Sequence, residues 1–107
     1  MIAEVMSGGW SATAAGTDSG ATATKAAVSG KAHVVTHVSG HVDEDATLQL
    51  RGGSTVLAEW KVDVSAEGIA FKIPPGTWPC APGVAANLVL ANSNADAQVN
   101  MCGFTIP

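Results

Sequence analysis

The stretch TLQLRGGSTVLAEWKVDV, residues 47–64, decides the fold class. Its first five residues alternate polar and apolar side chains, which is the period of a β-strand with one buried face. The Gly52-Gly53 pair then permits the positive φ angles of a tight hairpin loop. A second alternating run follows, whose predicted inward face holds Val56, Ala58, Trp60 and Val62 and whose outward face holds Glu59, Lys61 and Asp63. The stretch therefore predicts an antiparallel hairpin.

Similar patterns lie on both sides of this hairpin. Residues 31–38, KAHVVTHV, are rich in β-branched residues, and the apolar residues of 69–73, IAFKI, alternate with Ala or Lys. The run 74–76, PPG, ends that strand because proline cannot donate to a β-ladder. Residues 84–91 and 98–106 predict two further strands. About six short strands, with no helical period for a crossover, predict an all-β fold: a small antiparallel β-sandwich or barrel over residues 31–107.

The segment before residue 31 has a different composition. Between Ser7 and Gly30, every residue is Ala, Gly, Ser or Thr except Trp10, Asp18, Lys25 and Val28. Such a segment has little apolar surface to compensate for the entropy lost on ordering. We therefore expect residues 1–30 to form an extended N-terminal arm, either a flexible tail or an arm that orders on a partner. The candidate partner-binding anchors in this arm are Ile2, Val5, Met6 and Trp10.

Length and charge exclude several classes of function. The chain has 107 residues, the length of one domain. Five Lys and Arg residues against nine Asp and Glu residues give a net charge of −4, so the chain lacks a basic face for nucleic acid or for an anionic membrane. It has no apolar run long enough for a transmembrane helix, and residues 1–6 do not resemble a secretory signal. We expect neither a nucleic-acid nor a membrane partner.

The predicted core contains few large apolar side chains for a domain of this size. Small domains with thin cores are often marginally stable alone and gain stability by oligomerising. We therefore expect the chain to associate with other subunits.

His33, His37 and His41 are the first candidates for a metal site. On a strand, His33 and His37 would point the same way but lie about 13 Å apart, too far to share one ion. We expect histidines that face solvent, with a metal held between subunits on a symmetry axis as the alternative. The consecutive acids at 43–45, DED, follow a glycine and precede a strand, so they predict a solvated turn rather than a calcium site.

No nucleophile has a catalytic setting. The G-x-S-x-G elbow of hydrolases is absent. Cys102 lies in the last predicted strand and is expected to be a buried structural thiol, whereas Cys80 lies in a loop without a basic neighbour to activate it. Two cysteines in a chain without a signal sequence favour reduced thiols over one bridge. We therefore predict no catalytic residues, no metal and no cofactor, and we do not expect an enzyme.

The loop at residues 74–83, PPGTWPCAPG, contains four prolines and Trp78. A stiff loop with an aromatic tip loses little entropy on binding, and tryptophan is favoured at interface hot spots, so Trp78 is a candidate partner contact. It could equally fold back as a plug over an open end of the sandwich. A sugar platform is a third option, but Thr77 is the only flanking polar residue.

The closing segment carries a family resemblance. It runs VAANLVLANS over residues 84–93, then a polar loop, then VNMCGF over residues 99–104. Together with the Ala/Gly/Thr-rich start and the compact β body, it resembles the small head decoration (cement) proteins of tailed bacteriophages, over residues 30–107. The resemblance implies a structural virion protein on the capsid exterior, made in the host cytoplasm. It also implies a homotrimer that binds the major capsid protein, clamps neighbouring capsid subunits and has no catalytic residues.

A second interpretation is a small carbohydrate- or surface-binding β-module of a phage appendage. This alternative expects Trp60 or Trp78 to be exposed beside polar groups, because sugar sites combine an aromatic platform with hydrogen-bonding neighbours.

Overall fold

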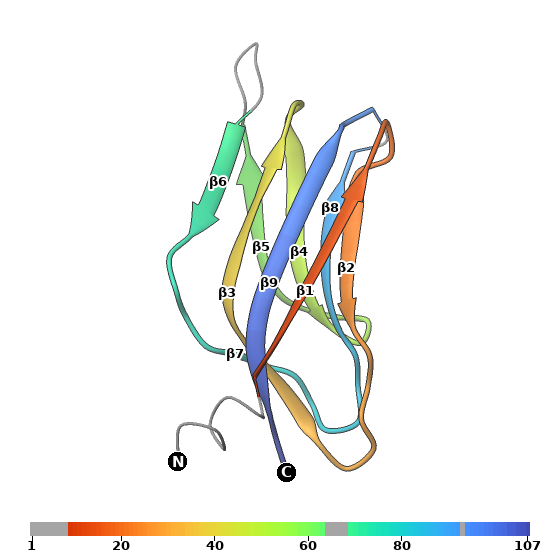
Figure 1. Cartoon of the computed structure of the whole chain (residues 1–107), viewed down its shortest axis with the longest axis vertical. Helices are drawn as coiled ribbons and strands as arrows, with labels where there is room; N and C mark the ends of the chain where they lie inside the picture. The colour runs from red at the N-terminus through yellow and green to blue at the C-terminus, as the bar shows by residue number, and fades with distance from the viewer. Residues whose placement is uncertain (1–8, 64–68, 93) are drawn as a thin grey trace.

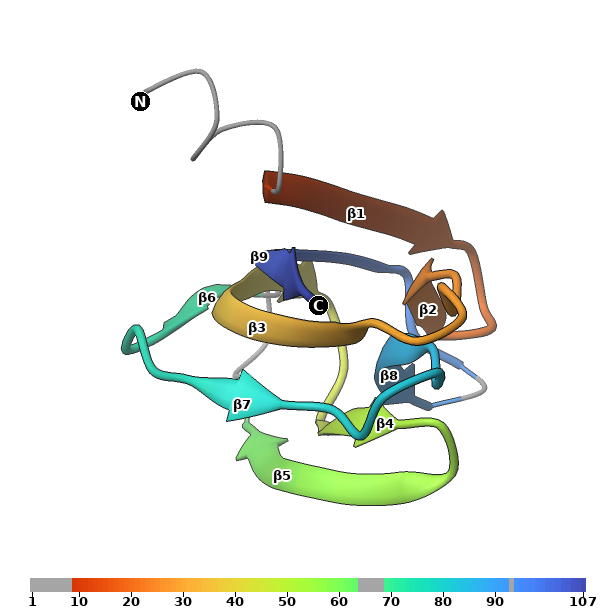
Figure 2. The ribbon, with the colours of Figure 1, turned by 90° about the horizontal axis from the view of Figure 1, so that it is seen from below.

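The computed structural model describes residues 9–63, 69–92 and 94–107. These residues form two antiparallel sheets packed face to face, so the predicted all-β class and β-sandwich are confirmed (Figures 1 and 2). In the first sheet the strand order is β1-β9-β3-β6, with β7 also paired to β3. In the second sheet the order is β2-β8-β4-β5. The strands are β1 Gly9–Gly16, β2 Ala21–Lys25, β3 Ala32–Val42, β4 Ala46–Gly52, β5 Thr55–Val62, β6 Ile69–Ile73, β7 Trp78–Pro79, β8 Ala86–Ala91 and β9 Ala97–Ile106.

The hairpin predicted for residues 47–64 is present as β4 and β5. Gly53 adopts a φ of 60° in its loop, which an L-residue with a side chain rarely adopts. The register shifts by one residue near the loop, so that Leu50 pairs with Ala58 but the next residue, Arg51, pairs with Val56. This bulge turns Val56 outward, where it is 47% exposed. The prediction that Val56 shares the inward face was therefore wrong.

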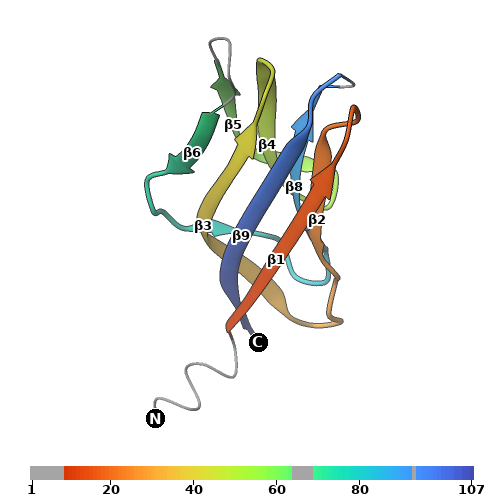
Figure 3. The same cartoon turned by 45° about the horizontal axis from the view of Figure 1, so that its top comes forward.

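The segment expected to be an arm is instead built into the sandwich over residues 9–25. β1 pairs with β9 through all of its residues, from Gly9 opposite Phe104 to Gly16 opposite Ala97. The chain then turns and enters the second sheet as β2, beside β8 (Figure 3). Backbone ladder bonds and small inward side chains order this segment, and neither depends on large apolar residues. Residues 1–8, with the predicted anchors Ile2, Val5 and Met6, lie outside the described residues.

The core lies between the two sheets and consists mainly of alanine and valine. Its largest fully buried apolar side chains are Leu48, Leu50, Leu88, Leu90, Met101, Val35, Val38, Val42 and Val99. In the described part of the chain no Phe or Trp side chain is fully buried, and Trp10, Trp60, Phe71 and Trp78 pack against the core from its margins. Among the same residues, no helix could span a bilayer. The core is therefore as thin as the sequence predicted.

Candidate partner-binding surface

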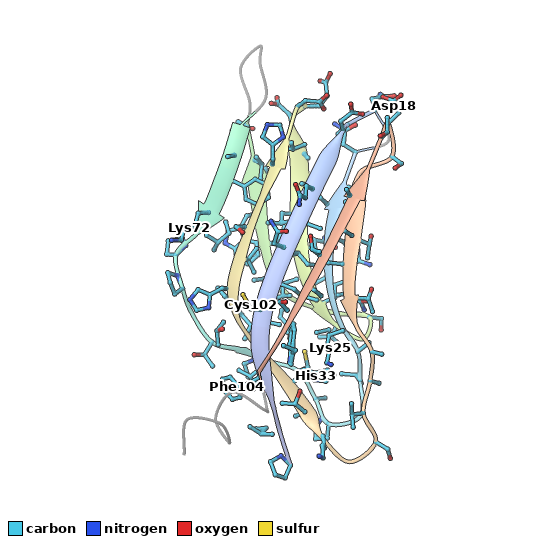
Figure 4. The ribbon with its side chains drawn as sticks, viewed as in Figure 1. Asp18, Lys25, His33, Lys72, Cys102 and Phe104 are labelled. Carbon is cyan, nitrogen blue, oxygen red and sulfur yellow. The ribbon has the colours of Figure 1, made fainter. Side chains whose placement is uncertain are left out.

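His33 lies inside the molecule, near the end of the sandwich where β1 begins (Figure 4). Its side chain has 0% exposure. The Nε2–H donates to the carbonyl oxygen of Ala26 at 2.7 Å, and Nδ1 accepts from the Thr105 hydroxyl at 2.8 Å. Both ring nitrogens therefore have partners in the neutral ring. The expectation that His33 faces solvent was wrong, although His37 and His41 are exposed as predicted.

A β-bulge explains why His33 and His37 differ. The pairing of β3 with β9 shifts register between Val35 and His37, so one residue is inserted into β3. Residues on either side of such an insertion keep an even spacing in sequence but point to opposite faces of the sheet. His33 therefore points inward beside Thr105, and His37 points outward beside Cys102.

Trp10 is held against His33 rather than presented to solvent. The two rings meet edge to face, with centroids 5.7 Å apart and planes at 73°. The indole lies over Gly103, because a Cβ built at that position would come within 3.0 Å of the Trp10 Cζ2 atom. The buried indole nitrogen has no hydrogen-bond partner among the described residues. Trp10 thus contributes to the body, and its predicted role as an arm anchor stays a prediction.

Close to this pair, β9 presents apolar side chains on its outer face. Phe104 and Ile106 are 39% and 41% exposed, and as alternate residues of one strand they point the same way. We call these two residues the terminal apolar patch. Phe104 lies directly opposite Gly9, the first described residue of β1. The patch therefore lies beside the start of the described chain, at the end of the molecule where Figure 4 labels Phe104.

Trp78 packs between the sheets at their open side. Trp78 belongs to β7 and pairs with Val35 of β3. Its ring meets that of Trp60 in β5 edge to face, with ring centroids 5.5 Å apart and planes at 88°. Backbone hydrogen bonds fasten its loop along β3: Gly76 N to Thr36 O, Cys80 N to His33 O, and Gly83 N to Lys31 O. This geometry is that of the predicted plug. Both indoles are half-buried against each other, so neither forms a flat exposed platform.

The two cysteines differ in exposure, and the prediction that Cys102 is a buried thiol was wrong. Cys80 is only 5% exposed and faces the core, and burial raises the pKa of its thiol above the ordinary value of 9.0. Cys102 is exposed on the outer face of β9, between Ser11 and His37 in the register. Both thiols are free. The thiol expected to be structural is thus the accessible one, because Cys102 alternates with the inward-facing Met101.

Acidic side chains lie at the opposite end of the molecule, where their carboxylates accept hydrogen bonds from backbone N–H groups of the turns. The carboxylate of Asp96 accepts from the backbone N–H of Asp18 at 2.9 Å, and that of Asp43 accepts from the N–H of Asp96 at 2.8 Å. Asp18 adopts a φ of 54° in this turn. Within the described ranges, no group of three or more His, Cys, Asp or Glu side chains could hold a metal ion. The acidic run at residues 43–45 follows β3 in the turn that the sequence predicted.

No protein-family model, curated protein or solved structure matches this chain. The surface must therefore be judged from its own geometry. The terminal apolar patch was not predicted, although the apolar pattern of the last strand indicates it. Residues 97–106 carry apolar side chains at both odd- and even-numbered positions, which point to opposite faces of a strand. Val99 and Met101 lie on one face, and Phe104 and Ile106 lie on the other. A strand that is apolar on both faces at an exposed end indicates a surface that a partner can cover.

Proposed function

We propose that this chain is a structural, non-catalytic virion protein that decorates the exterior of a phage head. It binds the major capsid protein and clamps neighbouring capsid subunits, with three copies assembled as a homotrimer. The family resemblance supplies the biological setting. The observation that carries the proposal in this chain is the terminal apolar patch, whose Phe104 lies opposite Gly9, the first described residue of β1.

The proposal assigns contacts with the capsid to the patch and to the apolar residues among the first eight. Residues 1–8 include Ile2, Val5 and Met6, and the patch adds two half-exposed apolar side chains beside Gly9. Apolar burial of this kind stabilises a contact by about 25 cal/mol for each Å² removed from water. One such contact is weak, but several copies joined to one another bind a repeated surface with high avidity.

The test separates this region from the fold. Because β1 begins at Gly9, a deletion for this purpose removes residues 2–8 and leaves both sheets complete. We expect that deletion, and separately the pair Phe104→Ser with Ile106→Ser, to weaken attachment to heads assembled without this protein. Val56→Ser is the matched control, since Val56 is slightly more exposed, at 47%, but lies in the second sheet. Undiminished attachment by the deletion and by the double variant would refute the proposal.

A sugar-binding module finds less support. That alternative needs Trp60 or Trp78 as an exposed platform, and the two rings instead pack against each other. A glycan array probed with the purified chain tests it directly, and binding lost in Trp78→Ala would favour it over capsid decoration.

A further inference from the structure

β5 is an edge strand whose free side no described strand covers, and its protective features are Lys61 and the bulge near Val56. It is the last strand of the second sheet and pairs with β4 on one side only (Figure 1). Its free side therefore carries backbone N–H and C=O groups that can pair with another strand. It is eight residues long and contains neither proline nor glycine. Edge strands with these properties are the ones to which other chains add.

The other edges of the described structure are better protected. β1 and β2 end their sheets on the same side of the sandwich and lie against each other at the corner that joins them (Figure 3). β6 spans five residues and is followed immediately by Pro74 and Pro75, which cannot donate to a ladder. The free edge of β5 has neither form of protection.

The charges of β5 are complementary to themselves in one register. Glu59 and Lys61 are alternate exposed residues and lie on the outer face, opposite Gln49 and Thr47 of β4. When two copies of β5 pair antiparallel about Trp60, Glu59 of each copy faces Lys61 of the other. Moving the register by two residues in one direction places Glu59 opposite Glu59, and in the other direction places Lys61 opposite Lys61. Like charges directly opposite each other are destabilising, so the pairing about Trp60 is favoured.

The surrounding side chains fit this register. The Glu59 carboxylate accepts from Gln49 Nε2 at 2.9 Å, which fixes it on the outer face. Lys61 is exposed, so its ammonium group can reach a partner on a second copy. Trp60, on the two-fold axis, is half-buried and has a surface left to cover. The bulge near Val56 lies outside residues 58–62, which make the central pairs.

We propose that two copies of this chain associate through their β5 strands, which joins their second sheets into one continuous antiparallel sheet. The contact is isologous, with the same patch on both copies. It has two-fold symmetry and is therefore distinct from any three-fold contact. A chain that has only the β5 contact forms dimers, and a chain that also forms trimers gives assemblies larger than three copies. The inference concerns the purified chain and does not rest on the proposed function.

Charge reversal tests the register, with molar mass measured by light scattering and sedimentation from micromolar to millimolar concentration. Glu59→Lys places Lys opposite Lys twice per contact, and Lys61→Glu places Glu opposite Glu. We expect each to weaken the contact roughly tenfold and to halve the mass of the assembly at intermediate concentration. The double variant Glu59→Lys with Lys61→Glu restores opposite charges and should restore the mass. Lys72→Glu, an exposed reversal on β6, is the matched control and should leave the mass unchanged.

Each result decides the proposal. Equal masses for the wild-type chain and both single variants would overturn it, and so would a double variant that stays dissociated. Amide hydrogen exchange of the unchanged chain provides a measurement that no folding defect can confound. Protection of β5 amides should rise with protein concentration while that of β8, an interior strand, stays constant. Protection of β5 that is independent of concentration would also overturn the proposal.

Discussion

Replacing His33 by alanine should lower the free energy of unfolding by about 4 kcal/mol. The change leaves the Ala26 carbonyl and the Thr105 hydroxyl without their buried partner, at about 1 kcal/mol each. It also removes the edge-to-face contact with Trp10, worth about 1 kcal/mol. The cavity left by a fully buried ring adds about 1 kcal/mol more. In a domain of this size, each kcal/mol lowers Tm by about 4–8 °C.

The assay is urea unfolding at one fixed protein concentration, because association contributes to apparent stability. His37→Ala is the matched control: it lies on the same strand but is exposed, and we expect a change within about 0.5 kcal/mol. Thr105→Val should cost about 1 kcal/mol alone and much less when His33 is already alanine. Equal unfolding free energies for His33→Ala and His37→Ala would refute the reasoning.

Three further predictions concern backbone space and thiol chemistry. Gly103→Ala should destabilise the fold by more than about 2 kcal/mol, because its Cβ would overlap the Val34 carbonyl. Gly83→Ala has open space around it but a φ of 76°, and should cost about 1 kcal/mol. Urea unfolding compares the two variants. Cys102 should react with a thiol reagent in the native protein, and Cys80 only on unfolding; mass spectrometry identifies the labelled site. Because burial raises the pKa of the Cys80 thiol, the native state holds its proton more tightly than the unfolded state. Stability should therefore fall as pH rises above about 9. Unfolding at several alkaline pH values checks this, and an equal fall in Cys80→Ala would contradict it.

Local periodicity predicted strands at β3, β4, β5, β6, β8 and β9 because each carries its own pattern, whereas the two residues of β7 lie in the segment predicted to be a loop. β4 alternates polar and apolar residues, and its loop carries two glycines, so the hairpin could be predicted without knowledge of its neighbours. The face to which Val56 points could not be predicted in this way. It depends on a bulge, and a bulge is set by how two strands pair rather than by the residues of either one.

The same limit explains the histidines. His33 and His37 are four residues apart, and the period of a regular strand assigns them one face. The inserted residue between Val35 and His37 reverses that assignment. At the same point of the ladder, Gly103 of β9 lets the Val34 backbone approach closely. Nothing in residues 33–37 alone carries this information.

The segment over residues 9–25 was mispredicted for a different reason. Composition measures how much side-chain surface a segment can bury, and by that measure residues 7–30 should not order. β1 and β2 are ordered through ladders with β9 and β8, whose residues lie more than sixty positions away in the sequence. Alternating alanines suit such strands because they pack closely against the core from the margin of the sandwich. Small residues therefore indicated close packing here rather than a free arm.

The two proposed contacts use different parts of the fold, and this has a consequence for how they combine. The terminal apolar patch lies on the outer face of the first sheet and offers side chains, whereas the β5 edge belongs to the second sheet and offers backbone groups. Neither contact covers the other, so one copy can make both at once. The thin core makes both useful, because each contact buries surface that the chain cannot bury alone. A protein that engages an underlying surface and a neighbouring copy together gains avidity from each pair of weak contacts, and this is the physical requirement for a clamp.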